Sequence, residues 1–464
     1  MVLKFKGCFG DERLQKRAVK MIHEMFTSCM HSIRQITNDN SSQRGWYRFL
    51  RNSKTTEQAI IKEISHQCGY AVKDKIVLSI QDTSDINLYN HKRRIKIDDS
   101  IGTTNSPDHG LGFLIHPSLV VDALNGFPIG FSDIKVWNRS HEKIPKKGRE
   151  SINLPIEQKE SYKWIESSMR SKESLSDAKM VIIVQDREGD IYEQFAAVPD
   201  KKTHLLIRSR IDRRLDGGIK LFDKLAACDV AGTYSITIAG DKRKKQVKRT
   251  ATLEVRFCPI VLKRPKLVPK HVKENIHLYA VEAKEINAKT DQSVNWRILT
   301  TVPIKTLEDA LCVIEWYSWR WTIEEVFRIL KEEGYNIEAS ELEAPKAIRK
   351  MCLLMLITIV RLFQMRYCYS IPEGEMLEST LCFNEQQLEC LEQQCTIMEG
   401  KTDKQKNPYP KKTLARATWV IARLGGWKGY KSDRPPGITT LWIGLRRFNN
   451  IYDGWSLHKD VYTR

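Results

Sequence analysis

Apolar residues recur at helical spacing near the start of the chain. The positions that follow this spacing are Leu14, Ala18, Met21, Ile22, Met25 and Phe26. They predict an amphipathic helix from about Phe9 to Met30. A polar segment at 38–45 is expected to be a loop, and a further helix is expected after Thr55-Thr56. The pattern therefore predicts a small helical domain over residues 1–70.

From Lys75 onward, short apolar runs predict strands. Residues 76–80 and 180–184 form two five-residue runs, and each is followed by a glutamine and an aspartate. Asn125-Gly126 lies between two strand-like segments, which is a strong hairpin signal. Residues 213–303 alternate apolar with polar positions and include a strongly basic turn at 241–245. We therefore expect an α/β protein with a β-rich region at 213–303.

Helical spacing returns in the last third of the chain. It is expected at 306–330, at 346–366 and at 413–424, where Gly425-Gly426 would end the helix. Residues 373–399 contain seven glutamates and no lysine or arginine, so the composition changes sharply there. We take this change as a domain boundary and expect a helical C-terminal domain over 373–464.

The composition excludes several classes of protein. A chain of 464 residues predicts two to four domains, and an apolar fraction of 41% with 11 tryptophans excludes global disorder. The longest apolar run, Met351 to Val360, is too short to cross a bilayer. The first residues lack the apolar core of a signal peptide, so we expect a cytoplasmic protein. The 11 cysteines include no C-x-x-C pair and indicate buried thiols.

The positive net charge of the chain indicates an acidic binding partner. Lysine and arginine number 76 against 57 acidic residues, which gives a formal net charge of +19. Nucleic acid is the usual partner of such a surface, although a merely basic soluble enzyme would also fit. Basic residues also recur through residues 1–70, which indicates either a DNA-binding module or a solvated surface.

Two aspartates share one sequence context. Asp82 and Asp186 each follow an apolar run and a glutamine. Groups just past the carboxyl ends of strands face the crevice of an α/β sheet, where two carboxylates can hold a divalent metal. The alternative is that both are ordinary turn aspartates. Three acidic residues nearby compete for the same role: Asp85, Glu188 and Asp190.

A segment from Leu311 to Glu333 is expected to be one continuous helix. If so, Tyr317, Arg320, Glu324 and Lys331 fall within an arc of roughly 60° at about 100° per residue. Glutamate is a metal ligand, whereas arginine, lysine and tyrosine bind phosphate oxygens. The stripe therefore suits a metal-bound phosphodiester, although a solvated salt-bridge face has the same spacing. The adjoining face would pack against the sheet through Trp316, Trp319, Ile323, Val326, Phe327 and Leu330.

These motifs resemble a known family. The spacing Tyr317-x2-Arg320-x3-Glu324-x6-Lys331 is similar to the Y-R-E-K signature of bacterial insertion-sequence DDE transposases of the IS-four type, among which the Tn-five transposases are most similar. Further similar segments are 47–52, 160–164, 186–191, 295–301 and 422–426. The resemblance covers nearly the whole chain and is weakest in the acidic region.

The resemblance implies roles for individual residues. Asp82, Asp186 and Glu324 match the catalytic and metal-binding D-D-E triad. Trp296 matches a tryptophan on which a flipped base stacks. The other positions that match DNA contacts are Tyr317, Arg320, Lys331, Trp321 and Arg208.

The resemblance also implies the fold. It predicts an RNase H-like catalytic domain over 71–372, with the β-rich region as an insertion. The helices of 1–70 would bind transposon-end DNA, and those of 373–464 would dimerise. The implied partners are double-stranded end and target DNA together with a second copy of the chain.

The implied activity is cut-and-paste transposition. Two Mg²⁺ ions on the triad, with Mn²⁺ as a substitute, would support strand cleavage, a hairpin intermediate and joining to target DNA. A metal-dependent DNA nuclease on the same fold, without strand transfer, is the first alternative. A catalytically inactive DNA-binding protein descended from a transposase is the second. We expect a bacterial protein that acts at the nucleoid.

Overall fold

The computed structural model describes residues 5–37, 39–104, 110–140, 154–238, 249–286, 293–332, 334–371, 374, 376–430 and 432–462. Its contacts group the chain into two compact units. The helical unit comprises residues 1–71, 83–143 and 324–464, and the sheet unit comprises residues 72–82 and 144–323. The division at residues 70/71 and 372/373 stays a prediction, and the basic turn at 241–245 lies outside the described residues.

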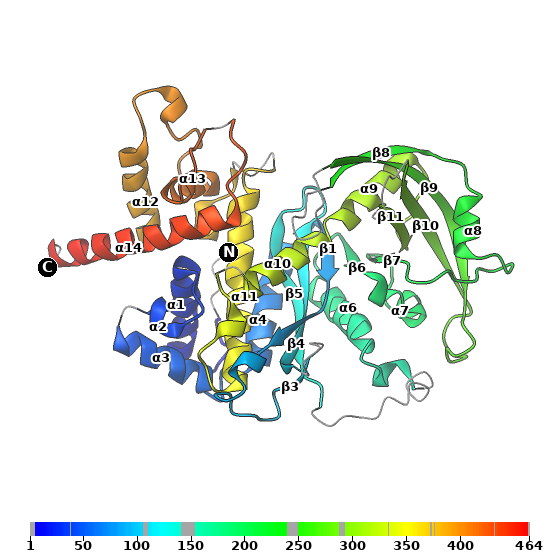
Figure 1. Ribbon diagram of the computed structural model, residues 1–464, viewed down its shortest axis with the longest axis horizontal. Coiled ribbons are helices and arrows are strands. Elements are labelled where there is room, and N and C mark those ends of the chain that lie inside the picture. Colours follow the sequence, from blue (N-terminus) through cyan, green and yellow to red (C-terminus); the bar gives the residue numbers. More distant parts are fainter. Residues whose placement is uncertain are drawn as a thin grey trace. The chain divides into compact units, whose positions relative to one another are not determined.

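The sheet unit is built on a mixed sheet. Its parallel part consists of β1 (Ile76–Gln81), β6 (Met180–Gln185) and β7 (Thr203–Arg208). Antiparallel strands continue the sheet in the order β11 (Asn295–Thr300), β10 (Asn275–Glu285), β9 (Arg249–Lys263) and β8 (Gly232–Ile238), the green group in Figure 1. The α/β class is thus confirmed, and the region expected to be β-rich contains β8 to β11.

The two kinds of strand differ in burial. Every residue of β1 and β6 after the first is buried, as expected where helices cover both faces of a parallel sheet. By contrast, β8 alternates half-buried and exposed residues, as in a sheet with one solvated face. The helices of this unit are α6 (Tyr162–Ser174), α7 (Tyr192–Ala197), α8 (Leu221–Ala226) and α9 (Leu307–Ser318).

The helical unit combines two ends of the chain with an antiparallel sheet. Its strands are β2 (Ser84–Asn87), β3 (Gly102–Thr103), β4 (Leu111–Asp122) and β5 (Pro128–Trp137), and β4 pairs with the other three. The hairpin predicted around Asn125-Gly126 joins β4 to β5. The helices are α1 (Glu12–Ser28), α2 (Ile33–Ile36), α3 (Asn40–Arg51), α4 (Glu57–Ala71), α11 (Pro345–Tyr367), α12 (Glu385–Met398), α13 (Leu414–Leu424) and α14 (Ile438–Tyr462).

Helix α11 lies at the centre of this unit. It packs against α1, α3, α4, α14 and β5, and it is the long yellow helix of Figure 1. Most of its 23 residues are buried, because apolar side chains point in almost every direction around the axis. In the part of the chain that the structure describes, no helix is both long and apolar enough to span a membrane.

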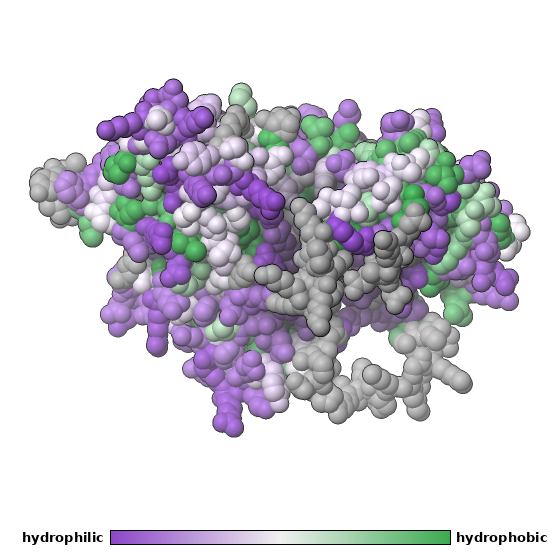
Figure 2. Space-filling model, turned by 45° about the horizontal axis from the view of Figure 1, so that its top comes forward, coloured by the Kyte–Doolittle hydropathy of each residue, from purple (hydrophilic) through white to green (hydrophobic). Residues whose placement is uncertain are grey.

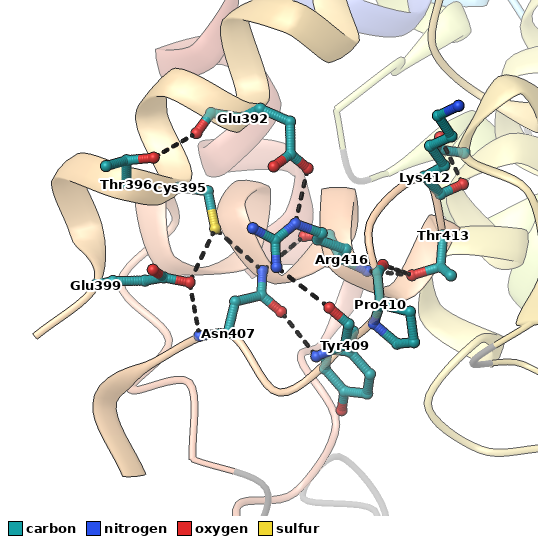
Figure 3. Close-up of polar contacts among 11 residues, drawn as sticks. Glu392, Cys395, Thr396, Glu399, Asn407, Tyr409, Pro410, Lys412, Thr413 and Arg416 are labelled. Carbon is teal, nitrogen blue, oxygen red and sulfur yellow. Dashed lines mark hydrogen bonds and ion pairs between the residues drawn. The ribbon is translucent and has the colours of Figure 1, made fainter. Parts of the chain in front are cut away.

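The acidic helix α12 is tied to α13 by polar contacts. Arg416 Nε donates to Glu392 Oε1 over 2.7 Å, and Asn407 Nδ2 donates to the Arg416 carbonyl over 3.1 Å (Figure 3). Arg416 Nη1 also donates to the carbonyl of Tyr409. Arg416 of α13 therefore offsets part of the negative charge of α12, and the bonds of Asn407 and Tyr409 fix the segment before α13 beside that helix.

The segment expected to be a loop at 38–45 is mostly helical, so that prediction was wrong. Helix α3 begins at Asn40, because the Asp39 side chain caps it by accepting from the Ser42 N–H at 2.7 Å. A capping aspartate and four polar residues give the first turn no apolar periodicity, although polar residues are common in first turns.

The single helix expected at 311–333 is interrupted, so that prediction was also wrong. Helix α9 ends at Ser318 and α10 (Trp321–Lys331) begins three residues later. Between them the Arg320 and Thr322 N–H groups bond to carbonyls three residues back, over 3.1 and 2.9 Å. Bonds of this kind turn the chain by about 120° per residue, so positions before and after the break do not share one straight stripe. The adjoining apolar face is buried as expected, except that Trp319 is half-buried.

A half-buried histidine predicts pH-dependent stability in the helical unit. The pKa of His23 is lowered from 6.5 to about 4 by burial and by the charge of Arg361, and its Nε2 lies 2.6 Å from Gln387 Nε2. Because the folded pKa lies below the unfolded one, the unfolded chain binds the proton first as pH falls. Stability should therefore decrease between about pH 6.5 and pH 4, by up to about 3 kcal/mol.

The measurement is the free energy of unfolding by denaturant at pH 7, 6 and 5. His23→Gln should show a shallower decrease over this interval than the original chain. Parallel decreases in both proteins would contradict a role for this histidine.

Candidate active site

The two aspartates lie at the same end of neighbouring parallel strands. In the register of β1 and β6, Ile80 pairs with Val184. Two positions further along each strand lie Asp82 and Asp186, both half-buried and both just beyond a fully buried glutamine. The carboxyl ends of parallel strands meet at one edge of a sheet, so this arrangement brings together the pair that the sequence singled out.

Each aspartate has a local hydrogen-bond partner. Asp186 precedes a short 3₁₀ turn (Arg187–Gly189), and its Oδ1 accepts from the Glu188 N–H at 2.8 Å. Asp82 Oδ2 accepts from Arg320 Nη1 at 3.3 Å, an ion pair in which both side chains are largely buried. The arginine of the signature is therefore held directly against a carboxylate.

Arg320 also contacts the tryptophan that follows it. Its guanidinium carbon lies 5.0 Å from the ring centroid of Trp321, within the range of a cation–π interaction. Trp321 is 57% exposed, whereas Arg320 is only 8% exposed. The pair thus presents an aromatic surface to solvent beside a buried positive charge.

Tyr317 lies among the other predicted DNA contacts. Its ring is buried and meets the half-buried Trp296 edge-on, with 5.7 Å between centroids. Burial raises the pKa of Tyr317, and the charge of Asp186 also raises it, while those of Arg320 and Arg208 oppose the increase. The phenol therefore stays protonated at neutral pH and can donate a hydrogen bond.

Arg208 lies at the end of β7. Burial lowers its pKa, and Tyr317 opposes that decrease. Its Nη2 donates to the carbonyl of Asn295 over 3.0 Å, which ties β7 to the start of β11. The sheet unit thus gathers two carboxylates, two guanidinium groups, a phenol and two indoles from distant parts of the sequence.

Glu324 and Lys331 belong to the helical unit, into which α10 continues. Both are half-buried and lie seven residues apart on α10, so they share a helical face. Lys331 Nζ lies 3.4 Å from both Asp85 Oδ1 and Glu338 Oε1. The lysine of the signature is therefore paired with acidic side chains in its own unit.

The competing acidic residues have other roles in the structure. Asp190 is fully buried, accepts from Arg213 at 2.7 and 2.9 Å and accepts from the Arg210 N–H. These bonds of Asp190 fix the position of the segment that follows β7. Asp85 pairs with Lys331, while Glu188 is 63% exposed and lies 3.6 Å from Lys163. Of these residues, Glu188 is the one placed to serve as a control for Asp186.

The donor set at the strand ends suits a hard divalent cation. Mg²⁺ is usually held by one or two carboxylates together with water and substrate phosphates, not by a full protein cage. Asp82 and Asp186 supply two carboxylates from neighbouring strands. Among the described residues no group of three or more His, Cys, Asp and Glu side chains is arranged for a metal. The residues present therefore fit a metal shared with a phosphate-bearing substrate.

A second candidate surface lies on the N-terminal helices. Arg44, Arg48 and Arg51 are exposed on α3. Beside them is a hollow of about 780 Å³ lined by Arg34, Thr37, Asp39, Asn40, Gln43 and Tyr47. On the face shown in Figure 2, hydrophilic residues are widespread and hydrophobic ones form separate patches. Amide, guanidinium and hydroxyl groups of this kind bind phosphates and base edges.

Two segments of the chain match family models. Residues 5–55 match the model described as transposase DNA-binding, and residues 158–361 match the transposase DDE domain. Both models describe transposase domains. Helix α3 lies in the first, whereas Asp186 and Glu324 lie in the second; Asp82 precedes the second segment.

A solved structure is similar to the chain at low identity. It is the cryo-EM structure of a piggyBac transposase synaptic complex with hairpin DNA, with 10% identity and a TM-score of 0.34. The match covers 76% of this chain and 66% of that chain, so the chain spans slightly less than two thirds of that protein.

The sequence singled out the aspartates but missed the role of the residues before them. Gln81 and Gln185 are both fully buried, and Gln185 Nε2 donates to Gln81 Oε1 over 2.7 Å. The Gln-Asp dipeptide that follows both apolar runs was the sequence feature that could have indicated this contact between the glutamines. An amide at the last position of a buried apolar strand needs a partner, and the equivalent amide on the next strand is the nearest one.

Proposed function

We propose that the chain is a cut-and-paste DNA transposase that acts as a dimer on paired transposon ends. The observation that carries this proposal is the pair of strand-end carboxylates, Asp82 and Asp186, with Arg320 bound 3.3 Å from Asp82. The two transposase domains support it, because one is a DNA-binding domain and the other a DDE domain. The net charge of +19 supports a nucleic-acid partner.

The proposal includes an RNase H-like catalytic fold of the IS-four and Tn-five type. The parallel strands β1, β6 and β7, with acids at the ends of two of them, support this fold. Strands β8 to β11 would form the insertion between Asp186 and Glu324. Residues 1–70 would bind transposon ends, 71–372 would cleave, and 373–464 would dimerise.

The catalytic roles follow from the chemistry of the side chains. Asp82, Asp186 and Glu324 would hold Mg²⁺, which supplies charge stabilisation at the phosphate and lowers the pKa of bound water. Arg320 and Lys331 would bind phosphate oxygens, exchanging their present carboxylate partners for the DNA backbone. The protonated Tyr317 would donate a hydrogen bond to the same phosphate.

Cleavage and joining would be successive phosphoryl transfers. Water attacks the end phosphate and releases a 3′-hydroxyl, which then attacks the opposite strand and closes a hairpin. A second water reopens the hairpin, and the 3′-hydroxyl finally attacks target DNA. Each step forms one phosphorus–oxygen bond and breaks another, so a single set of residues serves them all.

Two alternatives predict different products. A metal-dependent nuclease on this fold would nick DNA and stop. An inactive DNA-binding descendant would bind ends without cutting them. The half-buried indole of Trp296, next to Tyr317, favours the transposase, because a nuclease has no expelled base to hold.

Replacing Trp296 by alanine should separate nicking from hairpin formation. A hairpin expels a base, and an aromatic platform recovers about 1–3 kcal/mol of stacking. Nicking should continue at a near-normal rate while hairpin closure slows by about tenfold or more. The measurement follows nicked and hairpin products of labelled end DNA over time on a denaturing gel.

Trp296→Phe is the matched control, because it keeps a ring at the same place, and it should retain most hairpin formation. Equal loss of nicking and hairpin closure in Trp296→Ala, with a lower melting temperature, would show that the indole serves only to stabilise the packing of β11. That result would remove the stacking role and favour the nuclease.

A further inference from the structure

A cluster of uncharged polar side chains lies inside the sheet unit. Gln81 and Gln185 come from β1 and β6, Ser168 from α6 and Gln194 from α7, and all four are fully buried. The glutamines immediately precede Asp82 and Asp186 along the chain. The cluster therefore lies directly behind the strand ends that carry the candidate metal ligands.

The four side chains form one hydrogen-bonded network centred on Gln185. Its Nε2 donates to Gln81 Oε1 at 2.7 Å and to Ser168 Oγ at 3.1 Å. Its Oε1 accepts from Gln194 Nε2, which also donates to the Gly189 carbonyl at 3.1 Å. Through these bonds β1, β6, α6, α7 and the turn after Asp186 are joined at one point.

Stability alone does not account for this network. A buried polar network that is only partly satisfied is less favourable than an apolar core of the same shape. Gln81 Nε2 is buried and has no hydrogen-bond partner among the described residues, which costs roughly 1–3 kcal/mol. Leucine or methionine would fill the same space without that cost.

We propose that Gln81 and Gln185 are positioning residues that fix the separation of the Asp82 and Asp186 carboxylates for binding a divalent cation. The proposal rests on the proposed function, because it takes the two carboxylates as a metal site. A direct amide–amide bond between the strands keeps their last residues in register, where the ladder ends and strands would otherwise separate. Groups behind a metal ligand typically change metal affinity by about 10- to 100-fold.

The turn after Asp186 supports this role independently. A Cβ added at Gly189 would lie 2.1 Å from Gln185 Oε1 and 2.8 Å from Gln185 Cβ. Gly189 does not have a positive φ, so its backbone does not itself demand glycine. The absence of a side chain there is therefore explained by the space that the Gln185 amide occupies beneath the turn.

The test is Gln81→Met in the full-length chain. This change removes the unpartnered amide, while Gln185 Nε2 keeps its bond to Ser168. Mn²⁺ binding to the protein with a short end-DNA duplex is measured by titration with electron paramagnetic resonance, after subtraction of the Mn²⁺ that the duplex binds alone, and stability is measured by thermal unfolding. We expect the Mn²⁺ dissociation constant to rise about tenfold, with a melting temperature that is unchanged or higher.

Gly189→Ala is the second variant, because it displaces the Gln185 amide without altering any hydrogen-bonding group. It should also weaken Mn²⁺ binding. The matched control is Gln364→Met, which removes a buried glutamine that donates to the Pro128 carbonyl in the helical unit. Its Mn²⁺ affinity should equal that of the original chain.

The outcomes separate this inference from the proposed function. If Asp186→Asn abolishes Mn²⁺ binding while Gln81→Met and Gly189→Ala bind normally, the metal site stands and the positioning role is wrong. A lower melting temperature with unchanged affinity in Gln81→Met would likewise make the network purely structural. If Mn²⁺ binding is absent, or survives Asp186→Asn, the metal site itself fails, and both proposals fail with it.

Discussion

Replacing Asp82 or Asp186 by asparagine is expected to reduce strand cleavage by at least about 10³-fold, with end-DNA binding nearly unchanged. Asparagine keeps the shape but removes the charge that holds a divalent cation, and metal stabilisation of the phosphate supplies several kcal/mol. Glu324→Ala should have the same effect if the triad is as proposed. Cleavage is measured on labelled end DNA with Mg²⁺, and binding by gel shift.

Glu188→Gln is the control for this prediction. Glu188 is an exposed carboxylate two residues from Asp186, and its contact with Lys163 is long. The variant should cleave at close to the normal rate. An inactive Glu188→Gln with an active Asp186→Asn would show that the metal-binding carboxylate of this turn has been misidentified.

The second large effect concerns salt. If binding neutralises six or more phosphates, affinity for end DNA should fall about 10³-fold or more between 50 and 200 mM salt. The slope of log affinity against log salt would be about 0.9 per phosphate contact. Exposed arginines on α3 supply some of these contacts in the proposed function. Fluorescence anisotropy over a salt series provides the slope.

Single substitutions calibrate that slope. Arg44→Gln should lower it by about one unit, whereas Arg44→Lys, which keeps the charge, should leave it unchanged. A slope near zero in the unaltered chain would overturn the nucleic-acid assignment altogether.

Local patterns in the sequence were sufficient to predict the strands that carry the aspartates. Ile76–Ile80 and Met180–Val184 are apolar runs bounded by polar residues, and they form β1 and β6 with few changes at their ends. The shared Gln-Asp context also pointed to one sheet edge, and the parallel register places both aspartates there.

The break between α9 and α10 could not be predicted in the same way. Apolar residues continue at helical spacing through 316–330, although the helix is broken between Ser318 and Trp321. The chain around Trp319 and Arg320 contains no proline or glycine that would mark an end. Local spacing therefore favoured a continuous stripe that the structure interrupts.

Ion pairs between distant segments also could not be predicted from the sequence. From the spacing along one helix, we expected both cations to bind phosphate. In the structure Arg320 binds Asp82, and Lys331 binds Asp85 and Glu338. Which carboxylate a long side chain meets depends on tertiary packing. For the same reason, the hydrogen bond between Gln81 and Gln185 could not be inferred from either strand alone.

Strand transfer is the reaction that distinguishes a transposase from both alternatives, so it tests the central claim most directly. Purified chain is incubated with precleaved, labelled end DNA carrying a free 3′-hydroxyl, supercoiled plasmid and Mg²⁺. We predict that label becomes covalently joined to plasmid DNA, that joining requires Mg²⁺ and that Asp186→Asn abolishes it. Nicked plasmid without joined label, or end binding without any change in the DNA, would contradict the assignment.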